Sequence, residues 1–314
     1  MNNNLNSGYG QLIANRLANR LAGKTIIVGK AALAHIDIYK EIFVPDAEGK
    51  VLFAATIDAA IGLCTANAGD NIYVLPGHTE AVTSSSIACD VAGVNIIGLG
   101  SGAMKPVLTF GTTSSRINVT AANCVFQNFR FTAGIGDVVT AVLHATAAQN
   151  TRYVDIEFYA TSTFNFINGY TLGAANISDG CEWRNNYLRT ADAGQLALVI
   201  TGADQNDLKF YDNFVLHNSA LPALLSAGAN DVLGLDVRGN FGETVQTDGA
   251  VGVLVACSGT ASSGRVTDND MKSADGAANV AIPIASKVYA ARNYIAGADE
   301  VGTVIAVGTL FDNT

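Results

Sequence analysis

Two groups of aspartates could supply acid/base catalysis or calcium ligands. They are Asp204, Asp207 and Asp212, and Asp268, Asp270 and Asp275. An enzyme that cleaves polysaccharides needs carboxylates that converge on one groove, either as an acid/base pair or as ligands of Ca²⁺. Aspartate is also a common turn residue, because its side chain bonds to nearby backbone groups. We interpret these aspartates as turn residues and predict no catalytic residue, with an opposed pair at Asp212 and Asp236 as the alternative.

His78, Glu80 and Asp70 could form a metal site or an acid/base group. Histidine ligands of a metal usually occur in pairs at short spacing, and His78 has no such partner histidine. We therefore predict a structural role for these three residues.

The five cysteines are odd in number and widely spaced, which fits neither a disulfide framework nor the CxxC pairs of a zinc site. They are Cys64, Cys89, Cys124, Cys181 and Cys257. We predict that they are buried thiols that fill the core. With no candidate ligand set left, the sequence predicts no metal and no cofactor.

The charge of the chain excludes several classes of partner. Only 14% of the residues are charged, and 18 basic against 27 acidic residues give a net charge of -9. This charge would repel a phosphate backbone, so no nucleic acid partner is expected. The sequence has no run of about 18 apolar residues, and its first six residues lack the basic and apolar regions of a secretory signal. We expect a soluble protein that is synthesised in a cytoplasm and has no membrane partner.

A repeat of 24 to 29 residues organises the second half of the chain. It appears when segments of the form apolar-x-x-x-aromatic are aligned on their last residue. The seven segments are 125–129, 154–158, 183–187, 210–214, 237–241, 266–270 and 290–294. Such a period, in a chain with 32 glycines and 49% hydrophobic residues, is typical of a β-solenoid. We predict an all-β fold, a right-handed parallel β-helix of roughly nine coils.

Three columns of this alignment predict how its side chains point. The first column is apolar in every copy and is predicted to face inward: Val125, Val154, Trp183, Phe210, Val237, Val266 and Ala290. The residues one position earlier are predicted to face outward: Cys124, Tyr153, Glu182, Lys209, Asp236, Arg265 and Tyr289. The third column precedes the last position: Asn128, Glu157, Asn186, Asn213, Asn240, Asn269 and Asn293. Because Asn tolerates the left-handed conformation and can bond to other Asn side chains along a stack, this column predicts a turn repeated in every coil.

Residues 1–50 differ from the repeat and are predicted to form an N-terminal arm or adaptor. Within them, residues 11–21 are predicted to form a helix. Its apolar residues lie near one face: Leu12, Ile13, Leu17 and Leu21.

A second helix is predicted at residues 57–64, with Thr56 as its N-cap. Its apolar face would close the open first coil, as terminal caps do in solenoids. The β-helix is predicted to extend over residues 51–314.

Three segments resemble the pectin-lyase-like β-helix proteins of tailed bacteriophages. They are TIDAAI at 56–61, GDNIYVLPGHTE at 69–80 and GLG at 98–100, and the resemblance covers about residues 50 to 300. It implies the β-helix and a capping helix. The family includes virion decoration proteins, tail spikes and fibres, and polysaccharide-cleaving enzymes, so the fold leaves the function open. Tail spikes of this type usually carry a large C-terminal domain, and only about twenty residues follow the last repeat here.

The resemblance therefore favours a structural virion protein that is not an enzyme, a head decoration (cement) protein on the capsid exterior of a tailed bacteriophage. It would be synthesised in the cytoplasm of the bacterial host and form a homotrimer. Its partner would be the major capsid protein, contacted by the arm through Leu12, Ile13, Arg16, Leu17, Arg20 and Leu21. The alternative is a tail spike or fibre that binds or depolymerises host surface polysaccharide. A host glycan would then be the partner, with Trp183, Tyr153 and Tyr211 on or near the solenoid wall as stacking residues.

Overall fold

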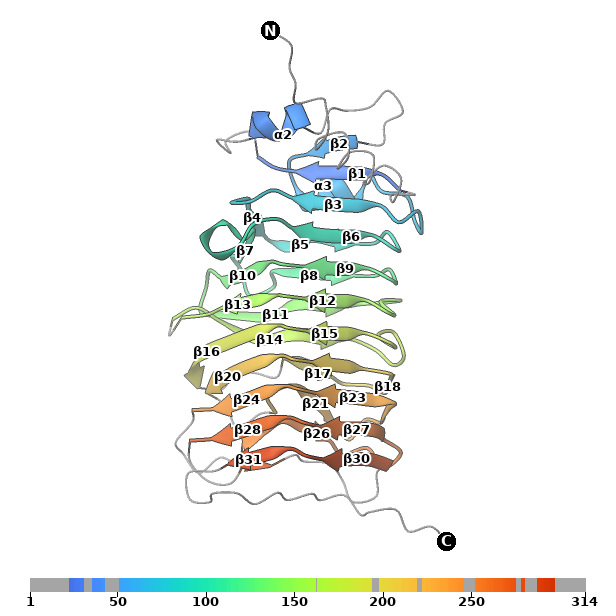
Figure 1. Cartoon of the computed structure of the whole chain (residues 1–314), viewed down its shortest axis with the longest axis vertical. Coiled ribbons are helices and arrows are strands. Elements are labelled where there is room, and N and C mark those ends of the chain that lie inside the picture. Colours follow the sequence, from blue (N-terminus) through green and yellow to red (C-terminus); the bar gives the residue numbers. More distant parts are fainter. Residues whose placement is uncertain are drawn as a thin grey trace, which may run out of the picture.

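The structure is a computed structural model. Short parallel strands joined by turns make up nearly all of the residues that it describes. It describes residues 23–30, 36–42, 51–161, 163–193, 198–218, 222–245, 252–274, 278–279 and 287–296. Each strand pairs in parallel with a strand of the neighbouring coil. The coils stack along one axis, with the N-terminal coils at the top of Figure 1.

Three parallel sheets form the walls of the solenoid. Sheet A has 11 strands in the order β2 (Val51–Ala54), β1 (Thr25–Val28), β3 (Asn71–Val74), β6 (Asn95–Gly98), β9 (Val125–Gln127), β12 (Arg152–Val154), β15 (Glu182–Arg184), β19 (Lys209–Tyr211), β23 (Leu235–Arg238), β27 (Ser263–Thr267) and β30 (Lys287–Ala291). Sheet B has nine strands: β4 (Thr79–Val82), β7 (Val107–Phe110), β10 (Arg130–Ala133), β13 (Glu157–Tyr159), β16 (Tyr187–Ala193), β20 (Phe214–Asn218), β24 (Phe241–Thr244), β28 (Asp270–Ser273) and β31 (Tyr294–Ala296). Sheet C has seven strands: β5 (Ser84–Cys89), β8 (Arg116–Val119), β11 (Asp137–His144), β14 (Asn165–Leu172), β17 (Val199–Thr201), β21 (Leu225–Gly228) and β26 (Val255–Cys257). Two short pairs lie outside these sheets: β18 (Gln205–Asn206) with β22 (Val232–Leu233), and β25 (Gly252–Val253) with β29 (Ala278–Asn279).

This topology confirms the predicted parallel β-helix. Each of the nine strands of sheet B follows a strand of sheet A, in agreement with the roughly nine coils predicted. Because the strands pair in register, each residue lies beside the equivalent residue of the next coil, about 4.8 Å away. Side chains of one kind therefore form columns that run along the axis.

A column of large side chains fills the solenoid behind sheet A. Its members are Phe126, Tyr153, Trp183, Phe210, Val237 and Val266, all buried. Trp183 stacks on Phe210, with 4.9 Å between the ring centroids, and on Tyr153, with 5.9 Å. The inward direction predicted for Trp183, Phe210, Val237 and Val266 is confirmed.

The predicted columns were wrong by one residue in the two earliest copies. Phe126 and Tyr153 occupy the inward column in place of Val125 and Val154, so Tyr153 points into the core and not outward. The alignment matched Phe129 and Phe158 with Tyr187, although Arg130 and Glu157 are in register with it. Both phenylalanines are buried core residues, and an aromatic residue at a strand start does not show which side of the wall it faces.

Five buried asparagines form a hydrogen-bonded ladder between sheets A and B. They are Asn186, Asn213, Asn240, Asn269 and Asn293, called here the asparagine ladder. In each of the first four, the backbone N–H and the side-chain Nδ2 donate to Oδ1 of the next asparagine, at 2.9 to 3.1 Å. The predicted stacking of Asn side chains is confirmed for these five residues.

Asn128 and Glu157 do not belong to the ladder, which corrects the predicted column. Ile156 occupies the equivalent position in the coil before Asn186, and its backbone N–H donates to Asn186 Oδ1 at 3.0 Å. The left-handed conformation belongs to the residue that precedes each ladder position. Its φ is positive in every coil from Asn128 onward: Asn128, Asp155, Asn185, Asp212, Gly239, Asp268 and Arg292.

The helix α3 (Ile57–Ile61) covers the first coil. Thr56 Oγ1 accepts a hydrogen bond from the Ala59 backbone N–H at 3.2 Å, as predicted for its N-cap. Ile57, Ala60 and Ile61 are buried against the core. The helix is shorter than the predicted 57–64 and ends at Gly62.

Part of the predicted arm belongs to the solenoid. Strand β1 pairs with β3 over four residues and with β2 on its other side, so sheet A includes residues from Thr25 onward. A second short helix, α2 (Ile36–Ile42), also falls within residues 1–50. The helix predicted at 11–21 lies outside the described residues, and the division into two domains stays a prediction.

A polar network crosses the core where sheets A and C meet. Nδ1 of His144 lies 2.7 Å from Ser178 Oγ, and its Nε2 lies 2.6 Å from the Tyr153 hydroxyl. All three side chains are fully buried, so this serine and histidine have no access to a substrate. Burial lowers the pKa of His144 to about 3, because the charged imidazolium would be removed from water.

We expect this histidine to make folding sensitive to acid. Its folded pKa lies below the ordinary value, so the unfolded chain binds the proton more tightly, and stability falls as the pH drops from about 6.5 toward about 3. The loss attributable to His144 at pH 4 should be about 3 kcal/mol. Urea unfolding at pH 7 and pH 4 of the wild type and of His144→Gln measures it. An equal loss in both proteins would contradict the prediction.

Candidate functional site

The first group of aspartates serves the turns of the wall. Asp204 Oδ1 accepts a hydrogen bond from the Asp231 backbone N–H at 2.8 Å. Asp207 and Asp212 have left-handed φ values of 54° and 55°. Asp236 lies on strand β23 and is bonded to Arg265 and Tyr211, which accounts for its carboxylate without an opposed partner at Asp212.

In the second group, one aspartate is engaged at a turn in the same way. Asp268 is a left-handed turn residue that pairs with Arg292 through two hydrogen bonds of 2.6 and 2.7 Å. Asp270 is an exposed residue of strand β28. Asp275 lies outside the described residues.

Asp70, His78 and Glu80 hold the N-terminal elements on the first coil. Asp70 is buried and accepts hydrogen bonds from the backbone N–H groups of Lys24 and Thr65, both at 2.6 Å. Glu80 Oε2 accepts from the backbone N–H of Ile57 at 3.0 Å and lies 3.1 Å from His78 Nε2. The cluster therefore fixes β1 and α3, which confirms the predicted structural role.

All five cysteines are free thiols. Cys89, Cys124, Cys181 and Cys257 are buried, as predicted, and Cys64 is half-buried. Burial raises the pKa of Cys64 and of Cys181 to about 12, so both are protonated and unreactive at neutral pH.

The described residues contain no group of three or more His, Cys, Asp or Glu side chains that could hold a metal ion. Within the same ranges, no helix is long and apolar enough to cross a membrane.

The aromatic residues predicted as sugar platforms do not present free ring faces. Trp183 and Tyr153 are fully buried inside the solenoid. Tyr211 lies on the outer side of sheet A, but its ring is covered by Arg184 at 5.1 Å and Arg238 at 4.6 Å.

The outer side of sheet A is a network of charged side chains. Arg265 binds Asp236 through two hydrogen bonds of 2.8 and 2.9 Å across adjacent coils, and both residues belong to the column predicted to face outward. Tyr211 donates its hydroxyl to the same carboxylate at 2.8 Å. Although partial burial acts to raise it, the hydrogen bonds from Arg265 and Tyr211 hold the pKa of Asp236 below its ordinary value. This face is polar and already internally paired.

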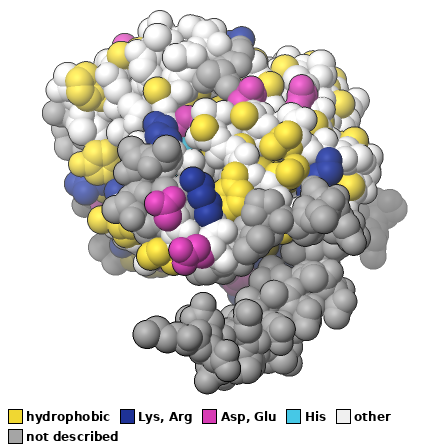
Figure 2. All heavy atoms as spheres, turned by 90° about the horizontal axis from the view of Figure 1, so that it is seen from above, with side chains coloured by type: hydrophobic (Ala, Val, Ile, Leu, Met, Phe, Trp, Pro, Cys, Tyr) yellow, Lys and Arg dark blue, Asp and Glu magenta, His cyan; other side chains and the backbone are white. Residues whose placement is uncertain are grey.

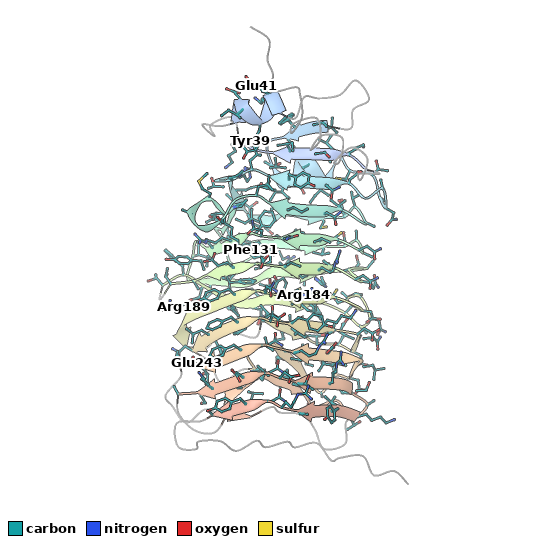
Figure 3. All side chains as sticks on the ribbon, in the orientation of Figure 1. Tyr39, Glu41, Phe131, Arg184, Arg189 and Glu243 are labelled. Carbon is teal, nitrogen blue, oxygen red and sulfur yellow. The ribbon has the colours of Figure 1, made fainter. Side chains whose placement is uncertain are left out.

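The outer side of sheet B is aromatic instead. Tyr187, Phe214 and Phe241 lie in register on adjacent strands, and their rings stack nearly parallel, with 5.1 and 4.7 Å between centroids. Figure 3 shows Arg189 and Glu243 on this side of the solenoid, away from Arg184 on sheet A. The sequence contained the signal, since these rings end three of the aligned segments, but their outward direction was not predicted.

A hollow lies beside the first ring of this stack. It has a volume of about 480 Å³ and is called here the Tyr187 hollow. Its lining comes from β13, the turn after it, and β16: Glu157, Phe158, Tyr159, Ala160, Thr161, Tyr187 and Arg189. Tyr159 is 52% exposed and Tyr187 is 38% exposed, so both rings are open to solvent.

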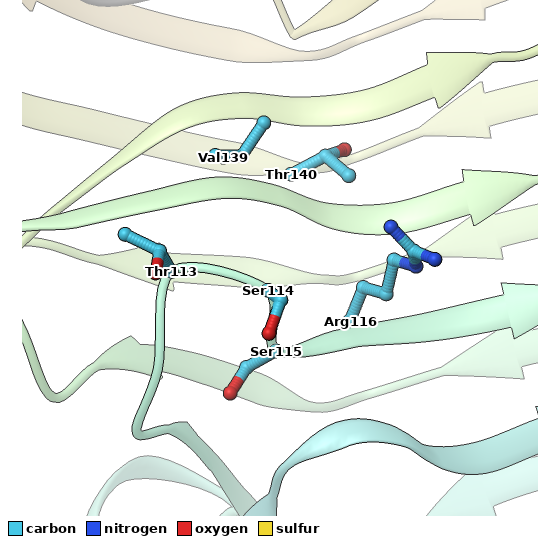
Figure 4. Close-up of a pocket in the computed structure, with 6 residues that line it drawn as sticks. All are labelled: Thr113, Ser114, Ser115, Arg116, Val139 and Thr140. Atoms are coloured by element: carbon cyan, nitrogen blue, oxygen red, sulfur yellow. The ribbon is translucent and has the colours of Figure 1, made fainter.

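A smaller hollow of about 200 Å³ lies where strands β8 and β11 begin. Its walls carry hydroxyl groups and one guanidinium, from Thr113, Ser114, Ser115, Arg116, Val139 and Thr140 (Figure 4). The hydroxyl of Ser115 is hydrogen-bonded to the backbone N–H and the hydroxyl of Thr112. Arg116 Nε donates to Asn118 Oδ1 at 3.0 Å. Its polar groups are therefore partly used within the wall.

Figure 2 views the solenoid from its N-terminal end. In the atoms visible from above, hydrophobic, basic and acidic side chains are interspersed (Figure 2). The predicted capsid contacts at Leu12, Ile13, Arg16, Leu17, Arg20 and Leu21 lie outside the described residues.

Comparisons with known proteins add little to this geometry. No protein-family model matches the sequence, and no curated protein matches it. Among solved structures, a rhamnogalacturonan lyase has a similar course of the backbone, with a TM-score of 0.39 and 9% sequence identity over 85% of this chain and 87% of that chain. What that enzyme does is therefore no guide to the function of this chain.

Proposed function

We propose that this protein is a non-catalytic structural protein of a tailed-bacteriophage virion, a decoration protein on the outside of the head. One observation carries the proposal: carboxylates that were candidates for catalysis form ion pairs with arginines of the next coil. The Asp236–Arg265 and Asp268–Arg292 pairs each connect adjacent coils. Such cross-linking suits a rigid rod whose task is mechanical.

In this proposal, residues 1–22 would attach the protein to the capsid. The apolar and basic residues of 11–21 would bind the major capsid protein. The first described strand of the solenoid, β1, begins at Thr25. We also propose that the decoration protein is a homotrimer.

The test compares the full chain with a variant that lacks residues 1–22. This truncation keeps β1, which a deletion of residues 1–45 would remove from sheet A. Both proteins are added to phage heads from which the native copy has been stripped, and occupancy is quantified by gel densitometry and electron microscopy. We expect the truncated protein to retain its thermal midpoint and circular dichroism and to lose at least 90% of its occupancy.

A second variant controls for loss of bulk. Leu17→Asp and Leu21→Asp together keep the length of the arm and change only its apolar face, and they should reduce occupancy as strongly as the truncation. Light scattering of each free protein gives its mass and tests the homotrimer. Full occupancy by the truncated protein would overturn the proposed role of the arm. Failure of the full chain to bind the heads would overturn the decoration role.

A further inference from the structure

Tyr187 presents the open end of the ring stack on sheet B. One face of its ring is covered by Phe214, and the last ring, Phe241, is covered by the ammonium group of Lys272 at 5.0 Å. In the coil before Tyr187 the same column holds Glu157, which has no ring. The second face of Tyr187 therefore borders the hollow.

Hydrogen-bonding side chains also line the Tyr187 hollow, beside Phe158 and Ala160. Tyr159 on β13 is in register with Arg189 on β16. The two side chains therefore come from neighbouring coils. Arg130 Nε donates to Glu157 Oε2 at 3.0 Å, and its guanidinium lies 6.0 Å from the centre of the Tyr159 ring. An open ring face thus has hydrogen-bonding groups beside it.

One charged side chain of the hollow is available to a ligand. Of the two charged side chains that line the hollow, Glu157 is paired with Arg130, and Arg189 has no ion-pair partner among the described residues. Arg189 is also exposed. A guanidinium without such a partner attracts an anion, and it binds a carboxylate through two parallel hydrogen bonds.

A sugar ring matches this combination of groups. The face of an aromatic ring carries negative charge density, so it attracts the C–H groups on one side of a pyranose. The hydroxyls at the edge of the sugar then reach Glu157 and Tyr159, and a carboxylate on the same ring reaches Arg189. A volume of about 480 Å³ is within the usual range of small-molecule sites.

We propose that the Tyr187 hollow is a binding subsite for an acidic polysaccharide, with one carboxylated pyranose unit stacked on Tyr187. The proposal goes beyond the structural role and does not depend on it. No bond is made or broken in this step, and the polysaccharide is held without being cleaved.

The experiment measures binding of the full chain to an array of acidic bacterial and algal polysaccharides. Each is paired with its carboxyl-reduced form, which has the same backbone without the charge. We expect binding to at least one acidic member and at least tenfold weaker binding to its reduced form. Absence of binding to every acidic member, or equal binding to a reduced form, would overturn the proposal.

Variants locate the subsite. Arg189→Ala removes an exposed charge and should weaken binding roughly tenfold or more. Tyr187→Ala removes the platform and should do the same, whereas Tyr187→Phe keeps the ring and should stay within about threefold of the wild type. Tyr294→Ala is the matched control, because Tyr294 is an exposed tyrosine in the same outer column of sheet B, far along the axis.

Two further outcomes separate this proposal from others. If Tyr294→Ala weakens binding as much as Tyr187→Ala, the sugar binds along the whole face and the assignment to the hollow is wrong. If Arg189→Ala leaves sugar binding unchanged but lowers occupancy on phage heads, the hollow is a capsid contact. Thermal midpoints of all variants are measured alongside, and Tyr187→Phe and Arg189→Ala keep the test valid if Tyr187→Ala does not fold.

Discussion

Replacing Asn240 with alanine is expected to lower the free energy of unfolding by about 3 to 5 kcal/mol. The Asn240 side chain makes five hydrogen bonds: with the backbone N–H and Nδ2 of Asn213, the carbonyls of Phe210 and Arg238, and Oδ1 of Asn269. Its removal leaves several of these groups buried without a partner, and each unpaired group costs about 1 to 3 kcal/mol. Denaturant unfolding followed by circular dichroism measures the change.

Asn293→Ala is the control for this prediction. Asn293 is the last member of the asparagine ladder and makes three hydrogen bonds, two with Asn269 and one with the Val266 carbonyl. We expect about half of the loss seen at Asn240. Equal losses at both sites, or a loss below about 1 kcal/mol at Asn240, would show that the ladder does not stabilise the fold in the way its hydrogen bonds indicate.

Replacing Trp183 with alanine should cost about 3 to 5 kcal/mol. Trp183 is fully buried and lies between Tyr153 and Phe210 in the column behind sheet A. The substitution removes the largest side chain of that column and leaves a cavity that neighbours held in register by the backbone cannot fill. The free energy of unfolding is measured by denaturant unfolding followed by circular dichroism, because the variant lacks the chain's one tryptophan.

Trp183→Phe distinguishes packing from the mere presence of a ring. Phenylalanine keeps the stacking on Phe210 and leaves a smaller cavity, so we expect a loss of about 1 to 2 kcal/mol. If Trp183→Ala were tolerated at less than about 1 kcal/mol, the column would be less tightly packed than its ring distances indicate.

The fold could be predicted from the repeat because each coil obeys the same backbone geometry. The residues Trp183, Phe210, Val237 and Val266 are in register on adjacent strands, and all four are buried as predicted. The prediction failed at Val125 and Val154. In these two coils the inward residue of sheet A is still four residues before the outward residue of sheet B, as it is in the later coils. The error arose because buried phenylalanines at 129 and 158 imitate the exposed aromatic that ends the later segments.

The candidate site was less accessible to sequence analysis. The turn role predicted for the aspartates is confirmed at Asp207, Asp212 and Asp268, whereas Asp270 lies in strand β28. The structural role predicted for the cluster around His78 is also confirmed. The Tyr187 hollow exists because the adjacent coil has no aromatic ring in the column of Tyr187. Glu157 stands where later coils carry a ring, and this becomes visible only once the strands are in register.

The asparagine ladder also bears on how such a protein changes its length. Asn186, Asn213 and Asn240 are separated by the same 27 residues, and each makes the same bonds to its successor. A segment of that size could be duplicated or deleted in one genetic event without leaving an unmatched surface, whereas any other insertion must form a loop. The distance between the two ends of the rod would then change in steps of one coil, about 4.8 Å each.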